Sequence, residues 1–323
     1  MRAVRFDEYG GPEVLRVREV PVPEPGAGEV LIEVGAAGVT LPVVRLTRGG
    51  PTGGVPLPHM PGGEVAGRVV AVGDGVTAWR PGQRVTGLAF TGGYAQFAVV
   101  GAGMLSAVPD GAADADAVAL VRSGRVAFAA LHLSAAGEGD RVLVTSAAGG
   151  VGNLAAQLAR VLGAGRVVAA IGSPDKADFL RGLGVDRVVT YDELRAGLGE
   201  SFDVVLDGTG SDVNGAGDVQ GACLDALEPL GRLVSYNAAG GPVDVNALRM
   251  RARSVIGLAM PHFVAHRREV YDRHERRLWE LLAAGEVRPA IHALLPLEEA
   301  AEAHRVIEAR ANRGKLVLDP AGR

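Results

Sequence analysis

A strand that leads through a glycine-rich turn into a helix constrains this chain more than any other feature. Residues 142–144 form an apolar run rich in β-branched residues, and a helical segment occupies residues 153–160. Glycines between two such segments let the backbone approach a bound phosphate, and the free N–H groups at the helix start face the anion. We therefore expect a phosphate-binding turn built by Ser146, Gly149, Gly150, Val151 and Gly152.

The segment that follows makes a dinucleotide site the favoured interpretation. A second apolar strand at residues 166–171 comes one helix length after the turn and completes a βαβ unit. Ala147 replaces the first glycine of the usual G-x-G-x-x-G spacing, so the motif alone is weak evidence. The alternative is a glycine-rich turn in an ordinary α/β unit that binds no nucleotide.

Alternating strands and helices continue on both sides of this unit. Helical patterns occur at residues 114–134, 150–163, 174–183 and 217–228, and apolar runs typical of strands occur at 141–146, 166–171, 186–190, 203–207, 231–236 and 254–259. Six strands interleaved with helices predict an α/β fold with a doubly wound parallel sheet. We assign this dinucleotide-binding domain to residues 119–259.

The N-terminal part of the chain has a different sequence pattern. Short apolar runs alternate with proline and glycine turns as far as Pro109, which disfavours long helices and predicts a compact β domain over residues 1–118. The C-terminal segment, residues 260–323, holds too few elements to bury a core alone. We expect it to fold back and complete the β domain.

Composition excludes several classes of partner. The 323 residues carry a net charge of −4 and only 4% aromatic residues, so nothing indicates a nucleic-acid partner. Cys223 is the only cysteine, which excludes an intramolecular disulfide and a multi-cysteine zinc site. The charged N-terminus does not resemble a signal peptide, and no apolar run reaches membrane-spanning length. We expect a cytoplasmic protein with no membrane partner.

The end of the second strand indicates which dinucleotide is bound. NAD-binding units place an acidic residue there for the ribose hydroxyls, but this chain has Gly172, followed by Ser173 and Lys176. A hydroxyl and an ammonium at this place suit a 2′-phosphate, so we favour NADPH over NADH. The alternative is that Lys176 is a solvated residue at a helix start, and the neighbouring Asp175 weakens an anion site.

Five segments together resemble one protein family over nearly the full length of the chain. They are residues 9–15 (YGGPEVL), 61–67 (PGGEVAG), 81–85 (PGQRV), 147–152 (AAGGVG) and 313–317 (RGKLV). With them the chain resembles the zinc-independent medium-chain dehydrogenases/reductases, and among these the quinone oxidoreductases. The resemblance implies a Rossmann domain, a GroES-like catalytic domain and a homodimer.

The resemblance also implies roles for individual residues. Ser173, Lys176 and Tyr191 match positions that hold the adenosine 2′-phosphate. Asn237 follows the fifth strand near the nicotinamide half, and Asn312 lies in the C-terminal segment that reaches back towards the cofactor. Tyr191 has a plainer alternative, an aromatic residue packed at a strand end.

The pattern of possible metal ligands points away from a metal. Zinc-dependent relatives carry a cysteine near Thr40 and a histidine near Gly63, and neither is present. His262 and His266 are four residues apart, but apolar residues separate them and Arg267 follows directly. We expect no metal site.

A site without a metal suits a substrate whose carbonyl is already conjugated to a C=C bond. The expected reaction transfers hydride from NADPH to an activated C=C bond of an enone, enoyl thioester or quinone. Thr40 is a candidate hydrogen-bond donor to the carbonyl oxygen, and Arg45 a candidate cation for an enolate or an anionic substrate, although a surface position for Arg45 is the alternative.

The chain departs from the family beside the expected nicotinamide. Thr40 stands where asparagine is usual, and Val126 stands where threonine is usual. These changes keep open a second hypothesis, an NADPH-binding protein with little or no catalysis. A third, interconversion of alcohols and aldehydes, lacks a carbonyl activator.

Overall fold

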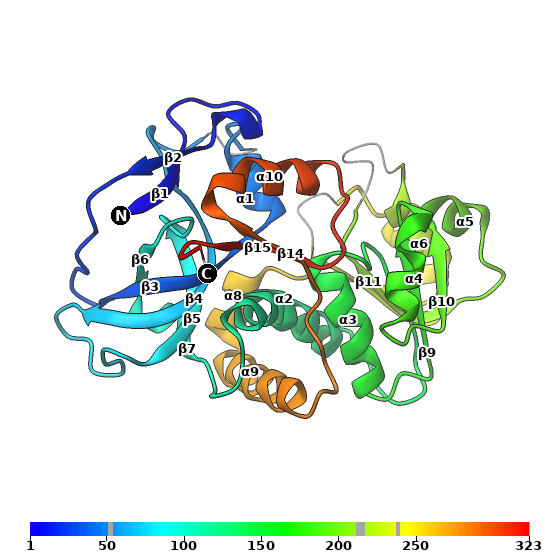
Figure 1. The fold of residues 1–323 in the computed structure, drawn as a ribbon. Helices are drawn as coiled ribbons and strands as arrows, with labels where there is room; N and C mark the ends of the chain where they lie inside the picture. The colour runs from blue at the N-terminus through cyan, green and yellow to red at the C-terminus, as the bar shows by residue number, and fades with distance from the viewer. Residues whose placement is uncertain (51–53, 211–216, 237–239, 323) are drawn as a thin grey trace. The chain divides into compact units, whose positions relative to one another are not determined.

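The computed structural model describes residues 1–50, 54–210, 217–236 and 240–322. The chain forms two compact units (Figure 1). The first comprises residues 1–122 and 290–323, and the second comprises residues 123–289. No helix within the described residues is both long enough and apolar enough to cross a bilayer.

The second unit is built on a parallel six-stranded sheet, as the alternating pattern predicts. Its strand order is β10-β9-β8-β11-β12-β13. The strands are β8 (Arg141–Val144), β9 (Arg166–Ile171), β10 (Arg187–Thr190), β11 (Phe202–Asp207), β12 (Leu227–Ser235) and β13 (Ser254–Gly257). The central strands are almost wholly buried, which explains why they read as continuous apolar runs.

Helices connect these strands and set the place where a ligand can bind. They are α3 (Gly150–Val161), α4 (Ala177–Arg181) after a short 3₁₀ turn η3 (Pro174–Lys176), α5 (Tyr191–Ala196), α6 (Val219–Asp225) and α7 (Val245–Met250). The strand order reverses between β8 and β11, which are neighbours in the sheet. Open parallel sheets bind ligands outside the carboxyl ends of the strands at such a reversal.

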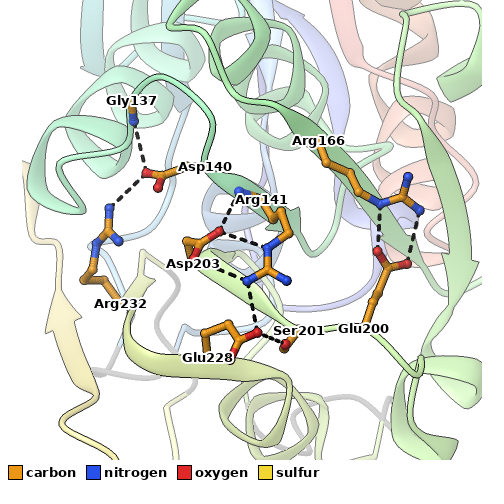
Figure 2. Close-up of polar contacts among 9 residues, drawn as sticks. All are labelled: Gly137, Asp140, Arg141, Arg166, Glu200, Ser201, Asp203, Glu228 and Arg232. Atoms are coloured by element: carbon orange, nitrogen blue, oxygen red, sulfur yellow. Dashed lines mark hydrogen bonds and ion pairs between the residues drawn. The ribbon is translucent and has the colours of Figure 1, made fainter.

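Ion pairs join the amino ends of the strands, at the other end of the sheet (Figure 2). Arg141 at the start of β8 pairs with Asp203 at 3.1 Å and with Glu228 at 3.0 Å. Arg166 at the start of β9 lies 2.7 Å from Glu200. Opposite charges therefore join the amino ends of neighbouring strands.

Residues 260–289 belong to the second unit. The second unit therefore extends beyond the boundary expected at residue 260. They form α8 (Met260–His266) and α9 (Arg268–Ala283). His274 of α9 stacks on Phe128 of α2 (Asp114–Leu133) at 4.9 Å between ring centroids, and Phe263 of α8 stacks on His274 at 6.1 Å. This aromatic stack holds both helices on the second unit, and the chain returns to the first unit at Ala290.

The first unit is a β domain completed by the C-terminal segment. Its larger sheet has the order β14-β15-β3-β4-β5-β7, and β6 also pairs with β3. The strands of this unit are β1 (Arg2–Arg5), β2 (Arg16–Glu19), β3 (Glu29–Val39), β4 (Pro61–Val72), β5 (Arg84–Thr91), β6 (Phe97–Gly101), β7 (Leu105–Ala107), β14 (Ile291–Pro296) and β15 (Lys315–Asp319).

The C-terminal strand lies inside this sheet, between β14 and β3. β15 runs antiparallel to β3, with Leu316 opposite Val39, and parallel to β14. Two short helices complete the unit, α1 (Leu41–Leu46) and α10 (Ala300–Glu308). From residue 290 onward the tail belongs to the first unit.

Candidate functional site

The predicted phosphate turn follows β8 and begins with a residue in an unusual conformation. Ser146 has a φ of +51°, in the left-handed region that residues with a side chain seldom adopt. The N–H of Gly149 donates to the carbonyl oxygen of Ser146 at 2.9 Å, which closes the turn. Helix α3 then begins at Gly150, with Gly149 as its N-cap.

The start of α3 is arranged to receive an anion. Within the described part of the chain, no side chain caps the N–H groups of its first turn. The helix is 12 residues long, so the partial positive charge at its start is fully developed. Backbone N–H groups of Gly150, Val151 and Gly152 are therefore available to phosphate oxygens.

Gly152 is required because helix and turn lie in close contact. A Cβ atom at this position would come within 2.3 Å of the carbonyl oxygen of Ser146 and 2.7 Å of the Cα of Ala147. At Gly149 the same test gives 3.2 Å to the Ser146 oxygen. Ala147 itself is fully buried and donates to the carbonyl of Ala170, so an alanine fits where the usual motif has its first glycine.

Tyr191 reaches this turn from the far side of β9. It is the first residue of α5, whose start is fixed by a capping box in which Thr190 and Glu193 each bond the other's backbone N–H. Its ring lies 3.4 Å from a Cβ placed on Gly172, so the ring packs over the end of β9. The tyrosine oxygen accepts from the N–H of Ser146 at 3.0 Å.

The residues expected at the 2′-phosphate lie together after β9. Lys176 ends η3 and is only 9% exposed, which does not fit a freely solvated side chain at a helix start. The hydroxyl of Ser173 donates to the carboxylate of the exposed Asp175. The same loop therefore holds a buried ammonium beside an exposed carboxylate.

The candidate catalytic residues share one short helix of the first unit. Thr40 is the N-cap of α1, and its carbonyl accepts from the N–H of Val44 at 3.0 Å. The Thr40 hydroxyl oxygen is buried and has no hydrogen-bond partner among the described residues. Arg45 lies in the last turn of α1, half-buried. A buried hydroxyl without a partner suits a group that bonds a ligand.

Of the two asparagines expected near the cofactor, Asn312 lies within the described residues. The Nδ2 of Asn312 donates to the carbonyl of Gly314 at 2.8 Å, just before β15. Asn237 lies outside the described residues.

The positions of the zinc ligands in related enzymes offer no donor here. A Cβ atom at Gly63 would lie 2.8 Å from the carbonyl oxygen of Gly38, so a histidine would not fit without moving the backbone. His262 and His266 lie on α8. Across the described ranges, no cluster of three or more His, Cys, Asp or Glu side chains could hold a metal ion.

Two polar residues at the carboxyl end of β11 are not among the residues that the sequence predicts for the site. Asp207 is fully buried at the end of β11, and its carboxylate accepts from the hydroxyl of Thr145 at 2.9 Å. Thr209, two residues later, lies 2.9 Å from the hydroxyl of Tyr191. A polar cluster directly after a buried strand, Asp207-Gly208-Thr209-Gly210, was the available signal.

Comparisons with known proteins agree with this architecture. The family model described as an alcohol dehydrogenase GroES-like domain matches residues 26–110, and the one described as a zinc-binding dehydrogenase matches residues 183–318. The chain is 32% identical to the quinone oxidoreductase of Homo sapiens, over 98% of this chain and 97% of that protein.

Solved structures are similar over the same length. A mycobacterial protein complexed with NADPH has a TM-score of 0.88 at 31% identity, covering 99% of this chain and 100% of the other. The CurK enoyl reductase has a TM-score of 0.83 at 26% identity, covering 98% of each chain. The predicted fold, a parallel Rossmann sheet with a GroES-like domain, is confirmed. By sequence and structure, the chain belongs to the quinone oxidoreductase family of medium-chain dehydrogenases/reductases.

Proposed function

We propose that this protein is an NADPH-dependent oxidoreductase that reduces a quinone or an activated C=C bond of an enone or enoyl thioester. The proposal rests on two features at the carboxyl ends of β8 and β9. The first is the start of α3, whose N–H groups no side chain caps among the described residues. The second is the buried Lys176, with Gly172 in place of an acidic residue. The first feature receives a pyrophosphate, and the second favours the extra phosphate of NADPH. The relatives named as quinone oxidoreductases support the same activity.

In the proposed complex, Gly150, Val151 and Gly152 bind the pyrophosphate through their backbone N–H groups. Ser173 and Lys176 bind the 2′-phosphate, with Tyr191 against the same edge. Asn312 and Asn237 belong to the cofactor site by the same proposal. Because the turn and the loop after β9 are built on adjacent strands, they bind two parts of one dinucleotide.

Bound NADPH would supply a hydride to the β-carbon of the conjugated substrate and would become NADP⁺. The electron pair of the C=C bond then moves towards the carbonyl carbon, and negative charge develops on the carbonyl oxygen. The Thr40 hydroxyl donates a hydrogen bond to that oxygen, and the Arg45 guanidinium stabilises the charge. Solvent returns a proton to the α-carbon. No metal takes part in this scheme, because positions 40 and 63 hold threonine and glycine, which supply neither thiolate nor imidazole.

We also propose a cytoplasmic homodimer. Strand β13 is an edge of its sheet. Three large apolar side chains near that edge are 69–75% exposed: Leu230, Val245 and Met250. Exposed apolar side chains beside an open strand edge favour pairing with a second copy. The single, buried Cys223 suits a reducing compartment.

Anaerobic mixing with NADPH and a panel of enones, enoyl thioesters and quinones tests the proposal. We expect oxidation of NADPH that depends on one substrate class, and slower oxidation of NADH. Tight binding of NADPH with no oxidation across the panel would instead favour a binding protein with little catalysis. One bound zinc per chain, found by metal analysis, would instead favour the third hypothesis, interconversion of alcohols and aldehydes.

A further inference from the structure

A series of hydrogen-bonded amides runs along α3, from the phosphate turn to the segment that leads back to the first unit. It consists of the side chains of Asn153 and Gln157, one helical turn apart, and the backbone of Arg288, shortly before the first unit resumes at Ala290. Asn153 is fully buried and Gln157 is 7% exposed. Buried amides keep their hydrogen bonds in one arrangement, because an unpaired donor or acceptor costs free energy.

Arg288 fixes which way round the Gln157 amide lies. The backbone N–H of Arg288 donates to the Gln157 Oε1 at 2.9 Å, and the Gln157 Nε2 donates to the carbonyl oxygen of Arg288 at 3.0 Å. A rotated amide would place its oxygen against a carbonyl and its NH₂ group against an N–H, which would break both bonds. The same Nε2 also donates to Asn153, whose backbone and side-chain oxygens lie 3.2 and 3.5 Å away.

Gln157 in turn sets the orientation of the Asn153 amide. The Asn153 Oδ1 faces the Gln157 Nε2, so the Asn153 Nδ2 faces the start of the helix. This Nδ2 donates to the carbonyl oxygen of Gly149 at 2.7 Å and to that of Gly150 at 3.0 Å. Each amide presents a donor where the next group has an acceptor. The backbone of Arg288 therefore determines, through Gln157, which atom of Asn153 meets the phosphate turn.

The two carbonyls that Asn153 holds belong to the peptide planes of the expected phosphate donors. The C=O of Gly149 shares a planar unit with the N–H of Gly150, and the C=O of Gly150 shares one with the N–H of Val151. C=O and N–H point in opposite directions in a trans peptide. Bonds from Asn153 to these carbonyls therefore aim both N–H groups out of the helix start.

The turn has a physical need for such a donor. Gly149 and Gly150 are successive glycines, which have more backbone freedom than other residues. Within the described part of the chain, no side chain caps the N–H groups of this end of α3. Bonds from a buried side chain of the same helix restrict the glycines before a ligand binds, which lowers the entropy lost on binding.

We propose that Asn153 is a positioning residue of the phosphate turn, and that Gln157 holds Asn153 in the orientation this role requires. The inference rests on the proposed function, since it concerns the pyrophosphate end of the same cofactor site. NADPH and NADH share the pyrophosphate. Both cofactors should therefore depend on Asn153 to the same degree.

Asn153→Val and Asn153→Thr form the matched pair of variants that tests the proposal. The two new side chains have the same shape, but only threonine has a hydroxyl that can donate to the carbonyl four residues back, that of Gly149. Loss of one neutral hydrogen bond predicts about a fivefold rise in the dissociation constants of both NADPH and NADH for Asn153→Val. Asn153→Thr should restore most of the affinity. Fluorescence titration measures these constants.

Gln157→Met tests the second step, because methionine has a similar length but no amide. It should weaken the binding of both cofactors in the wild-type background. In the Asn153→Val background it should have little further effect, since the two residues act in series. Additive effects in the double variant would separate Gln157 from the turn and overturn its assigned role.

Equal constants for Asn153→Val, Asn153→Thr and wild type would overturn the role of Asn153. A rise confined to NADPH would overturn it as well, because the effect would then lie at the 2′-phosphate. Amide hydrogen exchange without cofactor gives a second readout, and exchange over residues 149–152 should be faster in Asn153→Val than in Asn153→Thr. If the wild-type protein bound neither cofactor, the proposed function would fail, and the exchange comparison would decide the role of Asn153.

Discussion

The Nζ of Lys315 lies 3.1 Å from the carboxylate Oε1 of Glu64, and both side chains are buried within the first unit. Lys315 begins β15 and Glu64 lies in β4, on either side of β3. A Cβ atom at Gly38 of β3 would come within 2.7 Å of the Glu64 Oε2 and 2.8 Å of the Lys315 Cε. The pair therefore crosses β3 at a glycine and fastens the C-terminal strand to the sheet.

Breaking this pair should destabilise the first unit. Burial lowers the pKa of Lys315, and Glu64 opposes that shift, so Glu64→Gln leaves a buried ammonium without its counter-charge. Removing one member of a buried pair predicts a loss of about 3 kcal/mol in the free energy of unfolding, measured in urea. The double variant Glu64→Gln, Lys315→Met should regain part of that loss. Equal stability of Glu64→Gln and wild type would contradict this account.

Gly152→Ala should weaken NADPH binding about tenfold or more. The added Cβ would meet backbone atoms of Ser146 and Ala147, which cannot rotate away. The turn must then open, and overpacking of this kind costs about 1–3 kcal/mol. Gly137→Ala is the control in the same unit, because a Cβ there meets no atom within 4 Å. Titration with NADPH gives both constants, and equal values for the two variants would count against the close contact.

Lys176→Ala should raise the Michaelis constant for NADPH by about tenfold and leave that for NADH unchanged. The reason is loss of one buried cation from the 2′-phosphate. Arg181→Ala is the charge-matched control, because Arg181 on α4 is exposed and paired with the nearby Asp178. Steady-state kinetics with both cofactors measure the effect. An unchanged NADPH constant would refute the assignment of Lys176.

The sequence predicts the phosphate turn but not the long-range contact that supports it. Gly149 and Gly152 follow a strand and begin a helix, and this local pattern is sufficient to place the turn. The left-handed residue is Ser146, where a sequence argument would look for glycine, because its stabilisation comes from Tyr191, 45 residues away. The contact between them depends on strand order.

The domain boundary shows the same dependence on long-range packing. Residues 260–289 carry ordinary amphipathic helices, and their sequence does not say which unit they cover. The stack of Phe128, His274 and Phe263 decides that they belong with the second unit. The sequence pattern predicts the return to the β domain at residue 260, 30 residues before Ala290, because the stack joins residues that lie far apart in the chain.

Thr40→Val should lower kcat while leaving the fold intact. The buried Thr40 hydroxyl bonds no group in the described ranges, so its removal leaves no protein partner unpaired and should not reduce the free energy of unfolding. If the hydroxyl donates to the developing oxyanion, kcat should fall about tenfold or more. Thr40→Ser keeps the donor and should retain most activity. A wild-type kcat in Thr40→Val would exclude the hydroxyl from catalysis.

His304 should make the protein less stable in weak acid. It is fully buried on α10, with Nε2 3.4 Å from the hydroxyl of Tyr94, and burial lowers its pKa from 6.5 to about 4. Between these two values the unfolded chain binds a proton that the folded protein does not. The free energy of unfolding therefore falls as the pH drops from 6.5 to 4, by at most about 3 kcal/mol from this group. Burial also lowers the pKa of His274 to about 4, which adds to the effect in the second unit.

His304→Gln should flatten this dependence, because glutamine takes up no proton in the same range. The measurement is the urea midpoint at several pH values between 4 and 7 for wild type and variant. His262→Gln is the control, since His262 lies exposed on α8 and its replacement should leave the slope unchanged. Parallel curves for His304→Gln and wild type would show that the acid sensitivity arises from other groups.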